Sequence, residues 1–413
     1  MHSVPLALQE ILSKCNLLPV EEVDLELAQG RVLATDAVAD TELPAFDRSA
    51  MDGIAVACAN ATQIGCILTE IGHSAAGAPF AGAWKPGGCV RIMTGGVVPP
   101  GADAVIAVEQ VERMVDGAVV RYRLLVAARP EQNITRKGAE VFQGQVVVRQ
   151  GQRLGAAHLG VLASFGHARV AVSARPKVAV LPTGSEVVPV HCKPGLGQIR
   201  DSNRHVITAL LADAGADVRQ YPVALDTAEA LTAALAAAWA EADVVVTSGG
   251  VSAGDHDLVP PTLLALGAQC HLHRIAIKPG KPFLFATRTR ADGRIQYAFG
   301  LPGNPISSYV CAVLLMLPAL AAMQGQGNDG QREWQLLEIP CSIPLPAIGP
   351  RMEVLAANLG TQLGESTHVV PRFAKGSADL TEFARGDVWV LRAAGSPPIE
   401  AGQTVSVLIR SRA

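Results

Sequence analysis

The chain has 413 residues, and its composition is that of a globular protein with several domains. Hydrophobic cores usually stop growing at about 250 to 300 residues, so we expect roughly three or four domains. Apolar residues make up 49% of the chain and charged residues 17%, which predicts an ordered protein. The net charge of −3 and the scattered Lys and Arg argue against a nucleic-acid partner, which requires a broad basic stripe.

The cysteines and the termini favour a soluble cytoplasmic protein with no membrane partner. The eight cysteines form no CxxC pair, so we expect free, mostly buried thiols. The first residues lack the basic start and apolar run of a secretory signal. The longest uncharged apolar run, Val310 to Met323, is shorter than the ~20 residues that a bilayer requires.

The first half of the chain predicts a helical element followed by a small β-rich domain. From Val4 to Arg31, apolar residues such as Leu8, Ile11 and Leu12 recur at helical spacing. From about Ile54 to Val148, short β-branched runs are separated by Gly and Pro clusters. The clearest of these runs are Cys89 to Met93, Ala104 to Val108 and Ala118 to Leu125.

Strands alternate with helices between Lys177 and His273. The expected order is a strand at Val178 to Leu181, a helix at Asn203 to Ala214, a strand at Val218 to Val223, a helix at Thr227 to Glu241 and a strand at Asp243 to Thr247. Leu231, Leu235 and Trp239 would bury one face of the second helix. The alternation predicts a mostly parallel sheet covered on both faces, with ligands beyond the carboxyl ends of its strands.

The chain after Gln324 loses helical periodicity and returns to short strands among many Gly and Pro. Val388 to Leu391 and Thr404 to Ile409 are examples. A stretch rich in Gly, Gln and Asn, from Gly325 to Gly330, is a candidate linker. We therefore expect a separate C-terminal β-barrel or sandwich.

The most informative segment, Val244 to Asp257, is an apolar strand that leads into a glycine-rich loop. Gly249 and Gly250 let the main chain and its N–H groups approach a phosphate, and a helix from about Leu258 would add its positive end. Without a ligand, the same loop is a tight turn between a strand and a helix. The carboxylates of Asp255 and Asp257 favour the phosphate, because carboxylates beside phosphates usually indicate Mg²⁺.

A second strand end carries an acid and several polar residues. Glu186 follows the strand that ends near Leu181, and it is either a further ligand of the same metal or a solvated surface charge. Ser202 and Asn203 open the next helix, where each is a candidate N-cap or a ligand contact.

Basic residues follow in a segment stiffened by prolines. Arg274, Lys278 and Lys281 suit a tetrahedral oxyanion such as phosphate or molybdate. A Leu-Pro-Gly-Asn-Pro turn then precedes an apolar helix, which Asn304 or Ser307 is placed to cap.

The β-rich part contains one unusual polar stretch, residues 44–53, which ends in an Asp-Gly pair. Such a pair is usually a turn. Thr94, which follows another strand, is predicted either to lie next to Asp52 or merely to close a hairpin.

Seven segments in this order resemble the molybdopterin molybdenumtransferase (MoeA) family and the gephyrin E domain: PAFDRSAMDG, RIMTGG, LPTGSE, RDSN, TSGGVSAGDHD, IKPGKP and LPGNP. The resemblance implies a homodimeric enzyme that uses Mg²⁺, releases AMP from adenylylated molybdopterin and transfers molybdate onto the dithiolene. It also implies a multidomain α/β plus β fold. Its parts would be an elongated N-terminal dimerisation domain (1–44 and 145–176), a small β-rich domain (45–144), an α/β domain (177–324) and a C-terminal β-barrel (330–413).

The resemblance, taken with these patterns, assigns candidate roles. Catalytic roles fall to Asp52, Thr94, Glu140, Glu186, Asp226 and Asp257, and the last three would bind Mg²⁺. Substrate contacts fall to Ser202, Asn203, Ser248, Gly249, Gly250, Ser252, Arg274, Lys278, Lys281, Pro302, Pro305, Arg351 and Ser377. The chain departs from the family pattern at Ile54, where Tyr is frequent, and at Ser185 and Glu140, where Asp is usual.

Two other functions share parts of this pattern. A molybdopterin adenylyltransferase has a similar TSGG loop but is usually a single domain. A gephyrin-like scaffold or an inactive paralogue would present a peptide-binding surface instead of a working site. The partners that the resemblance allows are a molybdopterin adenylyltransferase and proteins that mature molybdoenzymes.

Overall fold

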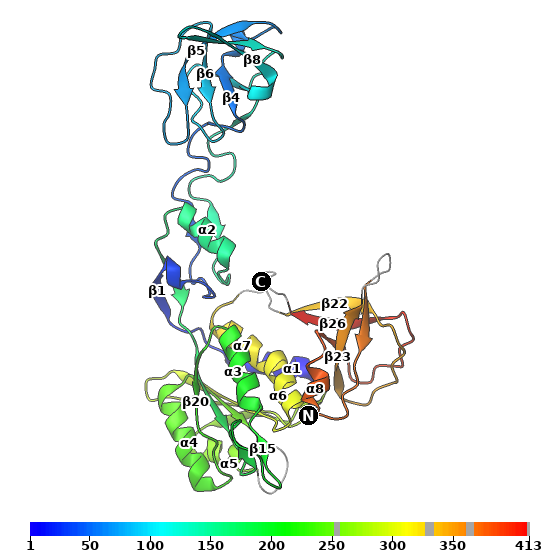
Figure 1. Cartoon of the computed structure of the whole chain (residues 1–413). Coiled ribbons are helices and arrows are strands. Elements are labelled where there is room, and N and C mark those ends of the chain that lie inside the picture. Colours follow the sequence, from blue (N-terminus) through cyan, green and yellow to red (C-terminus); the bar gives the residue numbers. More distant parts are fainter. Residues whose placement is uncertain (252–256, 327–333, 361–366, 411–413) are drawn as a thin grey trace. The chain divides into compact units, whose positions relative to one another are not determined.

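The computed structural model describes residues 1–251, 257–326, 334–360 and 367–410 (Figure 1). The chain forms two compact units. The large unit comprises residues 1–35, 149–159 and 168–413, and the small unit comprises residues 36–148 and 160–167. Each unit has its own sheets and cores, and the finer division into four domains stays a prediction.

The large unit is built on a six-stranded sheet of mixed direction. Its strand order is β16 (Asp217–Gln220), β13 (Lys177–Pro182), β17 (Val244–Ser248), β21 (Ile295–Leu301), β20 (Leu284–Thr289) and β18 (Gln269–His273). The first four strands are parallel to one another, and β20 and β18 pair antiparallel. The expected parallel strands are therefore present, and a hairpin that the sequence pattern did not predict extends the sheet.

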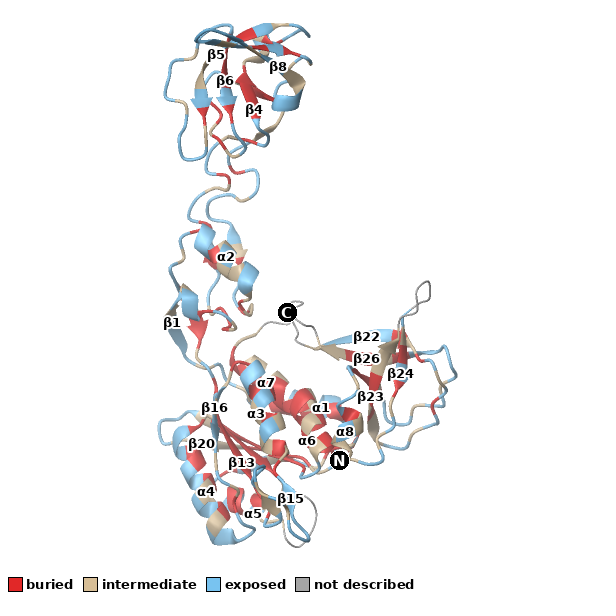
Figure 2. Cartoon of the chain, viewed as in Figure 1, coloured by how far each residue is buried: buried red, intermediate tan, exposed pale blue. Residues whose placement is uncertain are grey.

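Helices cover both faces of this sheet. Successive side chains of a strand point to opposite faces, so each strand contributes to a core on either side. Val178 and Val180 of β13 pack in one core with α3 (Asn203–Asp213) and α6 (Pro305–Cys311). Leu181 packs in a second core with α4 (Ala228–Glu241) and α5 (Val259–Ala265). Leu231, Leu235 and Trp239 are buried in the second core, as predicted. Figure 2 shows these buried layers in red.

The N-terminal helix is much shorter than the sequence pattern predicted. Helix α1 covers only Val4–Lys14, and the chain then forms β1 (Val20–Asp24), which pairs antiparallel with β12 (Arg169–Ser173). The buried face of α1 consists of Val4, Ala7 and Ile11, whereas Leu12 is exposed. The helical pattern was overridden because β12, from a distant part of the chain, offers a partner for an extended segment.

One apolar helix lies at the centre of the large unit. It runs through α6, a π-helical turn (Ala312–Met316) and α7 (Leu317–Met323). By length and composition its 19 residues could cross a membrane, but 72% of the apolar window is buried inside the protein. It packs against α1 and α3, so it is a core helix here.

The C-terminal strands of the large unit curl into a nearly closed sheet. The strand order is β19 (Ile277–Lys278), β23 (Met352–Gly360), β25 (Val388–Arg392), β26 (Thr404–Arg410) and β22 (Trp334–Pro340), with β24 (His368–Pro371) beside β23. A bridge between Cys341 and Val369 joins the two ends. Tyr309 of α6 packs against Phe383 of α8 (Leu380–Phe383) and Trp389, so one core runs from the helices into these strands.

The small unit contains a second six-stranded sheet. Its order is β7 (Ala104–Ala107), β4 (Gly53–Val56), β6 (Gly88–Ile92), β5 (Ile67–Ser74), β9 (Val119–Leu124) and β8 (Val111–Asp116). The β-branched runs expected near Cys89, Ala104 and Ala118 thus form strands. Short pairs flank the sheet: β3 (Arg48–Ser49) with β10 (Ile134–Thr135), and β2 (Ala37–Val38) with β11 (Val146–Val148).

The remaining elements are short. Within the described ranges they are α2 (Ala156–Ser164), β14 (Val187–Val188), β15 (Ile199–Arg200) and 3₁₀ turns at Leu25–Leu27, Cys58–Asn60 and Val108–Gln110.

Candidate functional site

A cavity of about 430 Å³ lies at the carboxyl ends of β13, β17 and β21, and we call it the sheet-edge cavity. This is the edge at which a parallel sheet usually binds its ligand. Ten predicted site residues line it: Glu186, Ser202, Asn203, Asp226, Ser248, Gly249, Gly250, Asp257, Pro302 and Pro305. Ser252 and Asp255, which were also predicted, lie outside the described residues.

The glycine loop of this cavity admits no side chain. Gly249 and Gly250 have φ angles of +100° and +65°, which L-residues rarely adopt. A Cβ atom on Gly249 would lie 2.7 Å from the carbonyl oxygen of Thr183, and one on Gly250 would lie 2.7 Å from a methyl carbon of Val259. The loop is therefore packed against its neighbours at two successive glycines.

Two sources of N–H groups that were expected to bind an anion here are not available: the N–H of Gly249 and the first turn of α5. The N–H of Gly249 donates to the carbonyl of Leu301 at 3.0 Å, so it is not free for a phosphate. Helix α5 begins with Val259 and then has Pro260 and Pro261, which carry no N–H group. Of the two predicted glycines, Gly250 is the better candidate donor.

Four carboxylates line the sheet-edge cavity: the three predicted metal ligands Glu186, Asp226 and Asp257, and Asp201, which pairs with Arg204. Asp226 is held by Ser185: the Ser185 N–H donates to Asp226 Oδ2 at 3.0 Å, and the Asp226 N–H donates to Ser185 Oγ at 3.3 Å. Thr227 caps α4 by accepting the N–H of Ala230 at 3.2 Å, which fixes the chain just after Asp226. Glu186 and Asp257 complete the acidic lining.

The oxygen donors suit Mg²⁺ that is bound partly by a substrate. Within the described ranges, no three His, Cys, Asp or Glu residues lie close enough to hold a metal ion on their own. Mg²⁺ usually takes only one or two carboxylates and completes its shell with water and substrate phosphates. The lining therefore fits a site in which the protein and the substrate phosphates together bind the metal ion. It does not fit a site in which protein side chains alone bind it.

Asn203 joins three segments of the cavity wall. Its Nδ2 donates to Ser248 Oγ and to the carbonyl of Gly303, each at 2.7 Å. Ser202 occupies the N-cap position of α3, as one alternative predicted, but neither its side chain nor that of Asn203 makes the capping bond. Asp201 takes this role, because its Oδ1 accepts the N–H of Arg204 at 3.1 Å. The sequence offered this signal, since Asp is a preferred capping residue.

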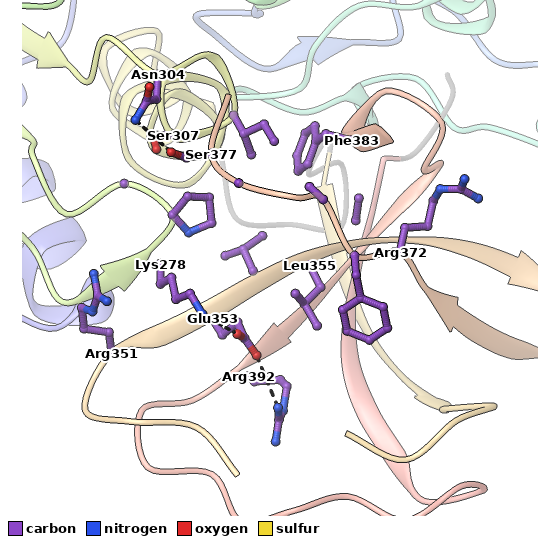
Figure 3. A pocket seen from close by; sticks show the side chains of 18 of the residues that line it. Lys278, Asn304, Ser307, Arg351, Glu353, Leu355, Arg372, Ser377, Phe383 and Arg392 are labelled. Carbon is purple, nitrogen blue, oxygen red and sulfur yellow. Dashed lines mark hydrogen bonds and ion pairs between the residues drawn. The ribbon is translucent and has the colours of Figure 1, made fainter. Parts of the chain in front are cut away.

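A second cavity of about 520 Å³ lies beside the C-terminal strands, and we call it the barrel cavity (Figure 3). Four predicted substrate residues line it: Lys278, Lys281, Arg351 and Ser377. Arg372 and Arg392 add two cations that sequence reasoning missed, and Glu353 and Glu382 add two acids. The lining is therefore rich in positive charge, which suits an oxyanion.

The two cavities adjoin, because Pro282, Asn304 and Ser307 line both. Asn304 occupies the N-cap position of α6 but makes no capping bond. Its Nδ2 instead donates to Ser377 Oγ at 2.8 Å, as Figure 3 shows. The residue predicted as a helix cap thus fixes a predicted substrate residue at the junction of the two cavities.

Arg274 is a predicted site residue of the large unit that lies within the described ranges but lines neither cavity. Its φ angle is +72°, and its N–H donates to the carbonyl of Phe283 at 2.8 Å.

The small unit brings Asp52 and Thr94 together. Thr94 donates its N–H at 2.7 Å and its hydroxyl at 2.8 Å to Asp52 Oδ1, and these bonds hold the pKa of the Asp52 carboxyl below its usual range. The prediction that Thr94 lies next to Asp52 is therefore correct. Glu140 forms an ion pair with Arg48 at 2.6 Å.

Comparisons with known proteins agree with the seven motifs. Residues 2–166 match the model of the MoeA N-terminal region (domain I and II), and residues 179–322 match a probable molybdopterin binding domain. A molybdopterin molybdenumtransferase of Haemophilus influenzae is 41% identical over 308 residues, covering 74% of this chain and 73% of that protein. One from Staphylococcus aureus is 31% identical over 407 residues, covering 98% of this chain and 94% of that protein.

The fold agrees as well. The crystal structure of a molybdopterin biosynthesis MoeA protein from Pyrococcus horikoshii matches with a TM-score of 0.82 at 26% identity, covering 99% of this chain and 100% of that chain. The resemblance seen in the sequence is thereby confirmed. The chain belongs to the molybdopterin molybdenumtransferase (MoeA) family, a family of transferases.

Proposed function

We propose that this protein inserts molybdenum into adenylylated molybdopterin, with Mg²⁺-dependent release of AMP, to form the molybdenum cofactor. The observation that carries the proposal is the pair of adjoining cavities. One is lined by Glu186, Asp226 and Asp257, and the other is rich in cations. A nucleotide diphosphate with its metal ion suits the first cavity, and an oxyanion suits the second.

The sheet-edge cavity would hold the pyrophosphate of the substrate. One or two of the candidate ligands Glu186, Asp226 and Asp257 would hold Mg²⁺ there together with the substrate phosphates, and the metal ion would neutralise charge on the phosphoryl oxygens. The Ser185 N–H orients Asp226, and Asn203 keeps Ser248 and Gly303 in fixed positions. Gly250 would donate its backbone N–H to a phosphoryl oxygen.

The barrel cavity would hold molybdate, which is the second substrate. Molybdate is a tetrahedral dianion, and Lys278, Lys281 and Arg351 would neutralise its charge. Ser377, held by Asn304, would add a hydroxyl at the junction with the sheet-edge cavity. An oxyanion bound there lies next to the nucleotide cavity, which favours transfer between the two.

The proposal includes a soluble, cytoplasmic homodimer. Asp52 would steer an oxygen nucleophile while the phosphoanhydride bond breaks and AMP leaves. Thr94 would hold the Asp52 carboxylate in one orientation, because both of its donors bind Oδ1. Glu140, which forms an ion pair with Arg48, is the alternative residue for steering that nucleophile.

The decisive experiment measures AMP release from adenylylated molybdopterin by the purified protein, with and without Mg²⁺ and molybdate. Formation of the cofactor is scored by activation of an apo-molybdoenzyme. We expect release that depends on both ions and is lost in the Glu186→Gln/Asp257→Asn double variant. Full release by this double variant would refute the roles of these carboxylates.

Two alternatives have distinct outcomes in the same assay. Adenylylation of molybdopterin by ATP, without molybdenum insertion, would identify an adenylyltransferase. Binding without turnover, together with nucleotide-independent peptide binding, would identify a scaffold or an inactive paralogue.

A further inference from the structure

Three charged residues form a row across neighbouring strands at the barrel cavity. Lys278 of β19 is the register partner of Glu353 on β23, and Glu353 is in turn the register partner of Arg392 on β25. Lys278 Nζ lies 3.5 Å from Glu353 Oε1, and Arg392 Nη1 donates to Glu353 Oε2 at 3.3 Å. Figure 3 shows Glu353 between the two cations.

The row runs from the interior to the solvent. The side chain of Arg392 is 1% exposed, that of Glu353 is 15% exposed and that of Lys278 is 63% exposed. Arg392 also donates to the carbonyl of Pro397 at 3.0 Å, so its guanidinium is fixed in place. A guanidinium keeps its charge in proteins, and a buried one requires an anion nearby. Glu353 supplies that anion.

The carboxylate of Glu353 is therefore shared between a buried cation and a cavity cation. One oxygen faces Arg392, and the other faces Lys278. An oxyanion that enters the cavity must compete with this second oxygen for the Lys278 ammonium. The other acid of the lining, Glu382, is engaged with Arg372 and Arg385.

We propose that Glu353, anchored by Arg392, is the resident counter-anion of Lys278 and sets how tightly the barrel cavity holds a tetrahedral oxyanion. The inference rests on the proposed function, in which that oxyanion is molybdate. A carboxylate beside Lys278 weakens the attraction for a dianion, and this keeps binding reversible enough for transfer to the acceptor. Arg392 offsets part of that repulsion from the interior side.

The two residues should have opposite effects on oxyanion affinity. Glu353→Gln removes one negative charge but keeps an oxygen and the side-chain shape, so the dissociation constant for molybdate should fall about fivefold. Arg392→Gln removes one positive charge, so the same constant should rise about fivefold. The double variant restores the charge balance and should lie near the wild type. If the pair merely stabilised the fold, both single variants would weaken binding.

The test is equilibrium dialysis of the full chain with molybdate alone and with tungstate alone, followed by metal quantification. Glu338→Gln is the matched control, because Glu338 lies on β22 of the same sheet and is not a lining residue of the barrel cavity. Its affinity should equal that of the wild type. Circular dichroism establishes that each variant is folded.

The outcomes separate this inference from the proposed function. Unchanged or weaker binding by folded Glu353→Gln overturns the inference, and so does the absence of oxyanion binding by the wild type. This criterion does not depend on whether Arg392→Gln folds. If affinities shift as expected but the wild type releases no AMP from adenylylated molybdopterin, the proposed function fails and the inference stands.

Discussion

Thr94 donates both its backbone N–H and its hydroxyl to the same oxygen of Asp52, at 2.7 and 2.8 Å. Two donors on one oxygen favour the charged carboxylate, and the backbone donor has the larger effect on the Asp52 pKa. The other oxygen of Asp52 is then the natural acceptor for a substrate proton. This arrangement links a turn of the small unit to the proposed chemistry.

Thr94→Val should raise the pKa of Asp52 towards its ordinary value, because the hydroxyl donor is lost and the backbone donor remains. NMR titration of the Asp52 carboxyl measures this shift directly. AMP release should fall about tenfold in Thr94→Val, because the carboxylate loses one of the two donors that orient it, and about 100-fold in Asp52→Asn, where the acceptor itself is lost. An unchanged rate in Asp52→Asn would remove Asp52 from the mechanism.

Gly249→Ala should destabilise the protein and reduce AMP release. The new Cβ would lie 2.7 Å from the Thr183 carbonyl oxygen, at a φ angle of +100°, so the loop must shift. We expect a loss of about 3 kcal/mol in the free energy of unfolding, measured by urea denaturation. Gly293→Ala is the control: φ is +83° but nothing lies within 4 Å, so only about 1 kcal/mol should be lost. Equal losses would argue against close packing of the loop.

Asp226→Asn should raise the Mg²⁺ concentration that gives half-maximal AMP release by about tenfold. The Ser185 N–H can still donate to the new amide oxygen, so the loop should keep its shape while the charge is lost. Titration of AMP release with Mg²⁺ after treatment with a chelator measures the shift. Glu229→Gln, an exposed change in the first turn of α4, should leave the titration unchanged. A titration identical to that of the wild type would exclude Asp226 from the metal site.

The residues that local sequence patterns located share one property. Glu186, Ser248 and Gly249 each follow or end a short apolar strand, and parallel strands bring their carboxyl ends to one edge. That geometry follows from the order of strands and helices alone. Glu186 and Asp257 could therefore be predicted from local patterns, whereas Asp226 was assigned only through the family resemblance and Asp201 was not predicted as a lining acid.

The residues that were missed depend on strand register. Arg392 ends an apolar strand and looks like a surface charge, and 39 positions of chain separate it from Glu353. Only the pairing of β23 with β25 and of β19 with β23 places Lys278, Glu353 and Arg392 side by side. Likewise, β1 exists because β12 pairs with it, and no local pattern reports that partner. In both examples the structure depends on pairing between segments that are distant in the sequence.

Arg136 joins two acids of the small unit, and this predicts how stability varies with pH. Its guanidinium contacts both Asp47 and Glu131. The Lys137 N–H and then Arg136 lower the pKa of Asp47, and Arg136 is the main cause that lowers the pKa of Glu131. A carboxyl with a lowered pKa in the folded state stabilises that state above its ordinary pKa, and loses this effect as the pH falls through the lowered value.

Arg136→Gln should therefore destabilise the small unit at pH 7, and its difference from the wild type should shrink as the pH falls below the ordinary values of 3.8 for Asp47 and 4.5 for Glu131. Urea unfolding of the full chain, followed through amide NMR signals of β3 and β10, measures the difference at each pH. Arg123→Gln breaks one exposed ion pair with Glu112 and should have a smaller effect at pH 7. A difference between Arg136→Gln and the wild type that persists undiminished in acid would show that Arg136 acts through packing and not through the charges of Asp47 and Glu131.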